Sequence, residues 1–258
     1  MSLNKNIRIF LIITFVITYL AWLISIFISY TIPDSTLVTI FHLIGGSGPL
    51  VGTIVILIKT KKVGTYFNNK LHFKGIKWNV WVIAFSPFII LTIVTFIYYG
   101  KLALDPEFIS MGLFYAVILL FFGPIPEEMG WRGILFDQLS DFSFWKAQIV
   151  TSIVWLVWHF PLFFIIGSYQ NQIGFGSADF FIWGLTLLFQ SFIMGYLYVF
   201  SNKSILIVIV FHYLVNLSGE FYLRDSVKDM AILFIYVVLL FIIFISPKKV
   251  FIKYTNDT

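Results

Sequence analysis

Apolar runs about as long as a membrane-spanning helix recur from one end of this chain to the other. A helix needs about 20 mostly apolar residues to cross the hydrocarbon core of a bilayer. Such runs lie near residues 9–29, 37–58, 79–99, 108–125, 144–166, 180–200, 204–221 and 230–246. We therefore expect an all-α fold, a polytopic membrane bundle of about eight transmembrane helices, formed as a single membrane domain over residues 1–258.

Charged residues make up 11% of the chain, whereas a soluble domain carries about 25%. Lysines and arginines gather in loops on one predicted side, and only Lys101, Arg224 and Lys228 fall on the other. Because basic loops stay in the cytoplasm, both termini are predicted to be cytoplasmic, which the basic tail at Lys248 and Lys249 supports. A multi-pass protein of the plasma membrane, the cytoplasmic membrane of a bacterium, is expected.

The net charge of +5 does not indicate nucleic acid, because the basic side chains lie in short loops that meet anionic lipid headgroups. The expected surroundings are the lipid bilayer, and no nucleic-acid partner is predicted. The chain has no cysteine, so a thiolate nucleophile, a thiolate metal site and a disulfide framework are all excluded.

Ionisable side chains inside a span cost about 2.5–3.5 kcal/mol each on insertion scales, so those that occur usually face an interior cavity. They therefore mark candidate functional positions. The candidates in or beside the predicted spans are His42, Glu127, Glu128, Arg132, His159, Gln190, His212 and Asn216.

The segment after the fourth run begins Pro126-Glu127-Glu128 and continues to Arg132. The i, i+4 spacing of Glu128 and Arg132 allows the two to pair on one helical face, while Glu127 points about 100° away and is free for chemistry. A proline followed by two acids is also an ordinary helix start, stabilised by the helix dipole. We expect residues 126–142 to form a short amphipathic helix or a re-entrant piece.

Two later runs carry histidine. His159 lies two residues before Pro161, which leaves a backbone carbonyl nearby without its helical partner. Taken alone, His159 is best interpreted as a buried histidine bonded to such a carbonyl. His212 and Asn216 share one face of the seventh run, where they could also serve as polar contacts between helices. Together with Glu127, however, these residue types supply what water-activating hydrolysis needs: a carboxylate base, a histidine and donors for an oxyanion.

The order Glu-Glu-x-x-x-Arg, aromatic-x-x-x-His, His-x-x-x-Asn resembles the CPBP family, the CAAX prenyl endopeptidase and bacteriocin-processing (Abi) membrane proteases. The resemblance covers residues 108–220. The second motif of that family usually begins with Phe, and Trp155 takes its place here. The resemblance implies an intramembrane endopeptidase, metal-independent and without a cofactor, that acts on a peptide or protein substrate entering from the membrane or the cytoplasmic face.

The resemblance also implies roles for the matching residues. Glu127 would act as general base and position the attacking water with His159, and His212 and Asn216 would stabilise the oxyanion. Glu128 and Arg132 would orient the site. In bacteria such a protein could mature peptides or give immunity to the cell's own bacteriocin.

Bringing these residues together poses a geometric problem. The predicted spans leave Glu127 near the inner face, whereas His159 lies about 20 Å along its helix from Lys146 at about 1.5 Å per residue. Either the fifth helix begins below the membrane, or the segment 126–139 re-enters it.

Four other functions are open at this point. Glu127 or Glu128 with two histidines could form a zinc-dependent membrane protease. A non-enzymatic immunity or peptide-binding protein, or a proton-coupled transporter using His42 and Gln190, could use the same residues. Gly45-Gly46-Ser47-Gly48 matches the Gly-x-Ser-Gly of rhomboid serine proteases, although helix packing explains these glycines more simply.

Overall fold

The computed structural model describes residues 4–222 and 226–245, and in this part of the chain the regular structure is helical, with one isolated β-bridge between Leu104 and Tyr222. The all-α prediction is confirmed. The helices are α1 (Lys5–Thr31), α2 (Thr36–Gly46), α3 (Gly48–Thr60), α4 (Val63–Lys70), α5 (Trp78–Tyr99), α6 (Pro106–Phe122), α7 (Pro124–Gly130), η1 (Trp131–Phe136), α8 (Asp137–Ser140), α9 (Phe144–Trp158), η2 (Phe160–Phe164), α10 (Tyr169–Ile173), α11 (Ala178–Phe200), α12 (Ile205–Phe221) and α13 (Ser226–Ile245). η1 is π-helical and η2 is a 3₁₀ helix.

Among the described residues, five segments are long and apolar enough to cross a membrane. They are Lys5–Thr31, Thr36–Thr60, Trp78–Tyr99, Phe144–Phe164 and Ala178–Phe200. Two shorter apolar stretches, Ile205–Phe221 and Met230–Ile243, accompany them. Helix occupies each of the eight predicted runs, so the multi-pass architecture holds, whereas the count of eight crossings stays a prediction.

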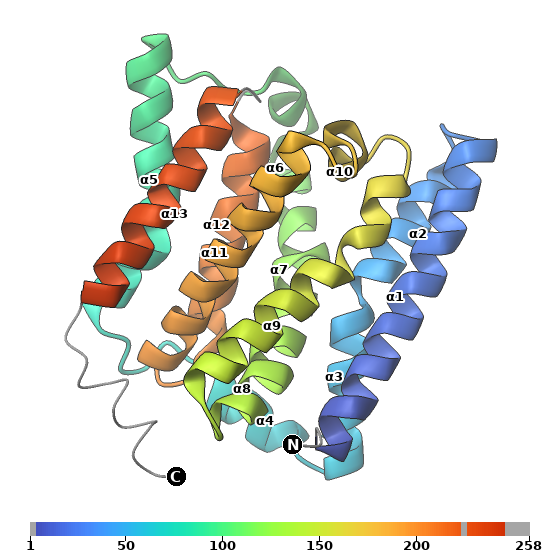
Figure 1. Cartoon of the computed structure of the whole chain (residues 1–258), viewed down its shortest axis with the longest axis vertical. Helices are drawn as coiled ribbons and strands as arrows, with labels where there is room; N and C mark the ends of the chain where they lie inside the picture. The colour runs from blue at the N-terminus through green and yellow to red at the C-terminus, as the bar shows by residue number, and fades with distance from the viewer. Residues whose placement is uncertain (1–3, 223–225, 246–258) are drawn as a thin grey trace.

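The long helices run side by side along the longest axis of the molecule (Figure 1). α1 begins at the end where α3 leads into α4, α5 likewise runs away from that end, and α13 runs back toward it. Lys101 follows the carboxyl end of α5, and its place on the outer side of the membrane stays a prediction. Arg224, Lys248, Lys249 and Lys253 lie outside the described residues, so the placing of both termini in the cytoplasm stays a prediction.

A cluster of ion pairs ties α4, α8 and the loop after α11 together at the end of the molecule where α4 lies, which we call the basic end. Asp137 Oδ2 lies 2.7 Å from Lys70 Nζ, and Asp137 Oδ1 lies 2.9 Å from Lys203 Nζ. Burial raises the pKa of the Asp137 carboxyl, but the two lysines outweigh that effect and hold the pKa below its usual value. Burial lowers the pKa of Lys70, and Asp137 only partly offsets it.

The Gly-Gly-Ser-Gly stretch is where α2 and α3 pack against α1. The helix breaks at Ser47, whose hydroxyl donates to the carbonyl of Ile44 at 2.7 Å. A Cβ added at Gly45 would lie 2.1 Å from Trp22 Nε1, and one at Gly48 would lie 2.2 Å from Thr18 Oγ1. These glycines therefore allow close helix packing, as the simpler interpretation predicted.

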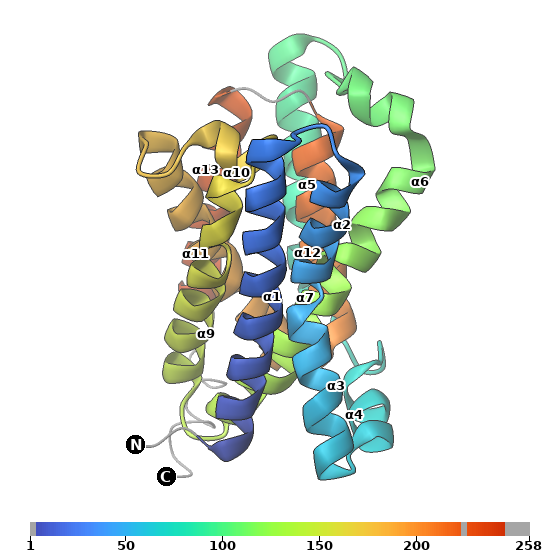
Figure 2. The same cartoon turned by 90° about the vertical axis from the view of Figure 1, so that its right-hand side faces the viewer.

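The segment that carries the acidic pair lies in the interior of the bundle. α6 bends at Gly112, where φ is 68°, and descends along the outside before α7 turns inward (Figure 2). Every residue from 126 to 136 is buried. Tyr66 of α4 donates to the carbonyl of Met129 at 2.6 Å, which ties this segment to the basic end. The burial excludes a surface amphipathic helix and fits the re-entrant alternative.

Candidate active site

Glu128 and Arg132 form the buried pair that their spacing predicted. Arg132 Nη1 donates to both carboxylate oxygens of Glu128, each at 3.0 Å, and both side chains are fully buried. Glu128 Oε1 also contacts His212 Nδ1 on α12 at 2.8 Å. One carboxylate therefore joins the α7–η1 segment to α12.

Glu127 points away from this pair, as the step of about 100° per residue requires. Its Oε2 accepts a hydrogen bond of 2.7 Å from the indole nitrogen of Trp155 on α9. His159 lies one turn further along, at the end of α9, where its Nδ1 contacts the carbonyl of Trp155 at 2.7 Å. Because a carbonyl only accepts, Nδ1 carries the proton of this bond and a neutral His159 keeps a lone pair on Nε2.

His212 and Asn216 face the acidic segment from α12. His212 is buried, and its ring centroid lies 5.5 Å from that of Trp155. Asn216 is half-buried. A Cβ added at Gly123 would lie 3.3 Å from Asn216 Nδ2 and 4.0 Å from Glu127 Oε1. The amide of Asn216 and the second oxygen of Glu127 thus lie around one point, beside a residue without a side chain.

The residues predicted from the sequence therefore converge. Glu127, Glu128, His159 and His212 are held by hydrogen bonds or ring contacts that link α7, α9 and α12. The depth problem is resolved because α7 lies inside the bundle rather than near its end, so that Glu127 reaches the level of Trp155.

Two other candidates lie apart from this contact set. The ring of His42 stands beside Trp22, whose indole donates to the backbone carbonyl of His42 at 2.9 Å. Gln190 is buried on α11, but it is the next residue, Ser191, that contacts Arg132.

Sequence reasoning missed the group that holds the arginine. Arg132 Nη2 donates to Ser191 Oγ at 2.7 Å, and Ser152 Oγ lies 2.9 Å from the same oxygen. Gln148 Nε2 donates to the Ser191 carbonyl at 3.0 Å. A signal existed, because Gln148, Ser152 and His159 recur at helical spacing on one face of the fifth run.

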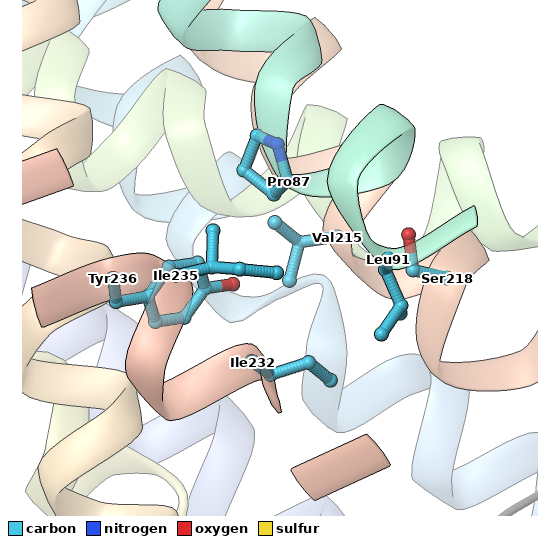
Figure 3. A pocket seen from close by; sticks show the side chains of 7 residues that line it. All are labelled: Pro87, Leu91, Val215, Ser218, Ile232, Ile235 and Tyr236. Atoms are coloured by element: carbon cyan, nitrogen blue, oxygen red, sulfur yellow. The ribbon is translucent and has the colours of Figure 1, made fainter. Parts of the chain in front are cut away.

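The pocket shown in Figure 3 is a different place. It lies between α5, α12 and α13, and its lining carries neither a carboxylate nor a histidine. The lining residues are Pro87, Leu91, Val215, Ser218, Ile232, Ile235 and Tyr236. Val215 and Ser218 lie on another face of α12 than His212 and Asn216, given 100° per residue. None of the acidic or histidine residues predicted from the sequence lines this largely apolar pocket.

Comparison with known proteins gives one relationship over most of the chain. A family model described as "Type II CAAX prenyl endopeptidase Rce1-like" matches residues 109–218. A protein of Methanococcus maripaludis named "CAAX prenyl protease 2" is 30% identical over an alignment 242 residues long, which covers 85% of this chain and 86% of that protein. The chain therefore belongs to the CPBP family of CAAX prenyl protease-like membrane proteins, and it is an endopeptidase.

Proposed function

We propose that this protein is a metal-independent glutamate endopeptidase, with Glu127 as the general base. The observation that carries the proposal is the contact of Glu127 with Trp155, since it brings the carboxylate beside the helix turn that bears His159. The side chains of Glu127 and His159 are buried, at 7% and 8% exposure, where electrostatic contacts act with little screening.

In the proposed reaction, Glu127 takes a proton from a water molecule while Nε2 of His159 accepts a hydrogen bond from the other O–H of that water. The resulting hydroxide attacks the scissile carbonyl carbon and forms a tetrahedral oxyanion. When the carbon–nitrogen bond breaks, Glu127 returns its proton to the leaving amine, so the carboxylate is regenerated.

His212 and Asn216 supply the donors for the oxyanion. Asn216 donates from its amide nitrogen, near the point that Glu127 Oε1 also faces. The Nδ1 proton of His212 is engaged by Glu128, so His212 donates to an oxyanion from Nε2 in its protonated form. Glu128 supplies the negative charge that accompanies this form, and Arg132 holds Glu128 in place.

Metal independence is part of the proposal. Glu128 is already engaged by Arg132 and His212, and in the described ranges no three Asp, Glu or His side chains converge as a set that could hold a metal ion. Hydrolysis by this arrangement needs only the carboxylate, the histidines and water. We expect activity to persist in a strong chelator; a loss that only added zinc restores would reverse this assignment.

The name of the relative suggests the substrate class. We propose a peptide anchored to the membrane by a prenylated cysteine near its carboxyl terminus, which reaches the site from the bilayer or its cytoplasmic face. The protein is proposed to reside in the plasma membrane. Peptide maturation or bacteriocin self-immunity would instead require cleavage of an unprenylated peptide.

The experiment compares the wild-type protein with Glu127→Ala in proteoliposomes, using a farnesylated CAAX peptide and the same peptide without the farnesyl group. Wild-type cleavage of the farnesylated peptide alone supports the full proposal. Asp34→Ala, in the exposed loop between α1 and α2, is the matched control and should retain activity. Cleavage that survives in Glu127→Ala would remove Glu127 as the base.

Mass spectrometry of membranes from cells that express either form gives a test without a chosen substrate. Peptides that appear only with the wild-type protein identify its products. A prenylated carboxyl-terminal fragment supports the proposed substrate, whereas products from unprenylated peptides alone would contradict it.

A further inference from the structure

We infer that Trp155 positions the catalytic carboxylate: its indole N–H fixes Oε2 of Glu127 and leaves Oε1 as the oxygen that takes the proton from water. The inference rests on the proposed function and deepens it. Unlike a phenylalanine ring, the indole of Trp155 carries an N–H that can donate a hydrogen bond.

Trp155 is the residue around which the α7–η1 segment, the end of α9 and α12 meet. Its ring centroid lies 5.3 Å from that of His159 and 5.5 Å from that of His212. The guanidinium carbon of Arg132 lies 5.1 Å from the same ring. The side chain is 1% exposed, so these contacts leave the indole little freedom to turn.

The indole N–H has one direction available to it, and it points at Glu127 Oε2 at 2.7 Å. A hydrogen bond from a neutral donor to a carboxylate is shorter and stronger than one between neutral groups. This bond restrains both the position of the Glu127 carboxyl group and the orientation of its plane, because Oε2 cannot rotate away without breaking the contact.

The other oxygen then faces the remaining space. Oε1 of Glu127 lies 4.0 Å from the position of a Cβ on Gly123, on the side where Asn216 Nδ2 approaches that same position at 3.3 Å. The proton acceptor and a candidate oxyanion donor thus both lie within 4.0 Å of one point. Trp155 also positions His159, the proposed partner of Glu127 in holding the water, since the Trp155 carbonyl accepts a hydrogen bond from His159 Nδ1.

The test replaces Trp155 with benzothienylalanine, in which sulfur takes the place of the indole N–H and the ring shape is kept. The matched control is the same replacement at Trp22, another buried tryptophan, whose N–H donates to the carbonyl of His42 away from the site. With the farnesylated CAAX peptide as probe, we expect kcat to fall about 10- to 100-fold at Trp155, with KM changed less than about twofold. The Trp22 replacement should leave both constants near wild type.

A second measurement reports the bond without catalysis. In protein labelled with ¹⁵N-tryptophan in nanodiscs, the Trp155 indole signal is assigned by its loss in Trp155→Phe. Glu127→Gln should move that signal upfield because the charge-assisted bond is lost, and Asp34→Asn should not move it.

The outcomes separate the two claims. A wild-type protein that cleaves the peptide, with an unchanged kcat for the Trp155 replacement or an indole signal that ignores Glu127→Gln, overturns the positioning role alone. A wild-type protein that cleaves no peptide at all overturns the proposed function and this role with it. A fall in kcat together with the moved signal supports both.

Discussion

Glu128 and His212 are separated by 84 residues in the sequence, and Oε1 of one lies 2.8 Å from Nδ1 of the other. The same carboxylate accepts two hydrogen bonds from Arg132. Glu128 thus holds a histidine on α12 and an arginine on η1 at once, which makes it the link between the proposed oxyanion donor and the rest of the site.

Replacing Glu128 with Gln should damage both stability and activity, because fully buried Arg132 would lose the charge that faces it. We expect the free energy of unfolding to fall by about 3 kcal/mol. The double variant Glu128→Gln, Arg132→Gln removes the uncompensated charge, so it should regain much of the stability while peptide cleavage stays low. Thermal unfolding in detergent and kcat measure the two effects. Full recovery of kcat in the double variant would show that Glu128 acts only through folding.

Ser191→Ala should destabilise the protein by about 1–3 kcal/mol, since it removes the 2.7 Å bond to a buried guanidinium. The matched control is Thr186→Ala on the same helix, whose hydroxyl donates only to the carbonyl of Ile182 one turn earlier. The two variants are compared by their unfolding midpoints. Equal midpoints would remove Ser191 from the support of Arg132.

Gly123→Ala probes the space beside the carboxylate. The added methyl would lie 3.3 Å from both Asn216 Nδ2 and the carbonyl oxygen of Leu119, tighter than most Cβ contacts, and 4.0 Å from Glu127 Oε1. We expect kcat to fall at least tenfold with a small effect on the unfolding temperature, because the methyl displaces the proposed oxyanion donor. Gly64→Ala is the control, since an added Cβ there meets nothing within 4 Å. A Gly123→Ala enzyme with wild-type kcat would place the reaction elsewhere.

The ion pairs at the basic end predict a pH effect. The pKa of Asp137 is lower in the folded protein than in an unfolded chain, so its stabilisation is present above the ordinary pKa near 4 and is lost as pH falls through the lowered value. Asp137→Asn should lower the unfolding temperature at pH 7 and flatten its decline below about pH 4. Asp34→Asn, at an exposed position, serves as the control. An unchanged acid decline in Asp137→Asn would contradict the assignment.

Much of the fold followed from the sequence because the bilayer sets both the length and the composition of a span. The predicted run 79–99 corresponds to α5, and 180–200 corresponds to α11. The pair of Glu128 and Arg132 was equally accessible, since an i, i+4 spacing fixes neighbours on a helix surface.

The depth of the acidic segment could not be read in the same way. Residues 126–136 show no length or periodicity that separates a buried turn from a surface one, and only packing against α4, α9 and α12 decides it. Ser191 was hidden for a related reason, because its partner Arg132 lies 59 residues earlier in the chain.

The π-helical turn of η1 follows directly after the acidic pair. A π-helix bonds each residue to the fifth along rather than the fourth, so it accommodates one more residue than an α-helical turn does. Between the carboxylates and the ion pairs of Asp137, Trp131–Phe136 therefore works as an adjustable spacer. Deleting one residue from it would restore α-helical bonding while keeping its two ends in register, so the join between the reaction centre and the ion pairs of Asp137 can absorb a change of length.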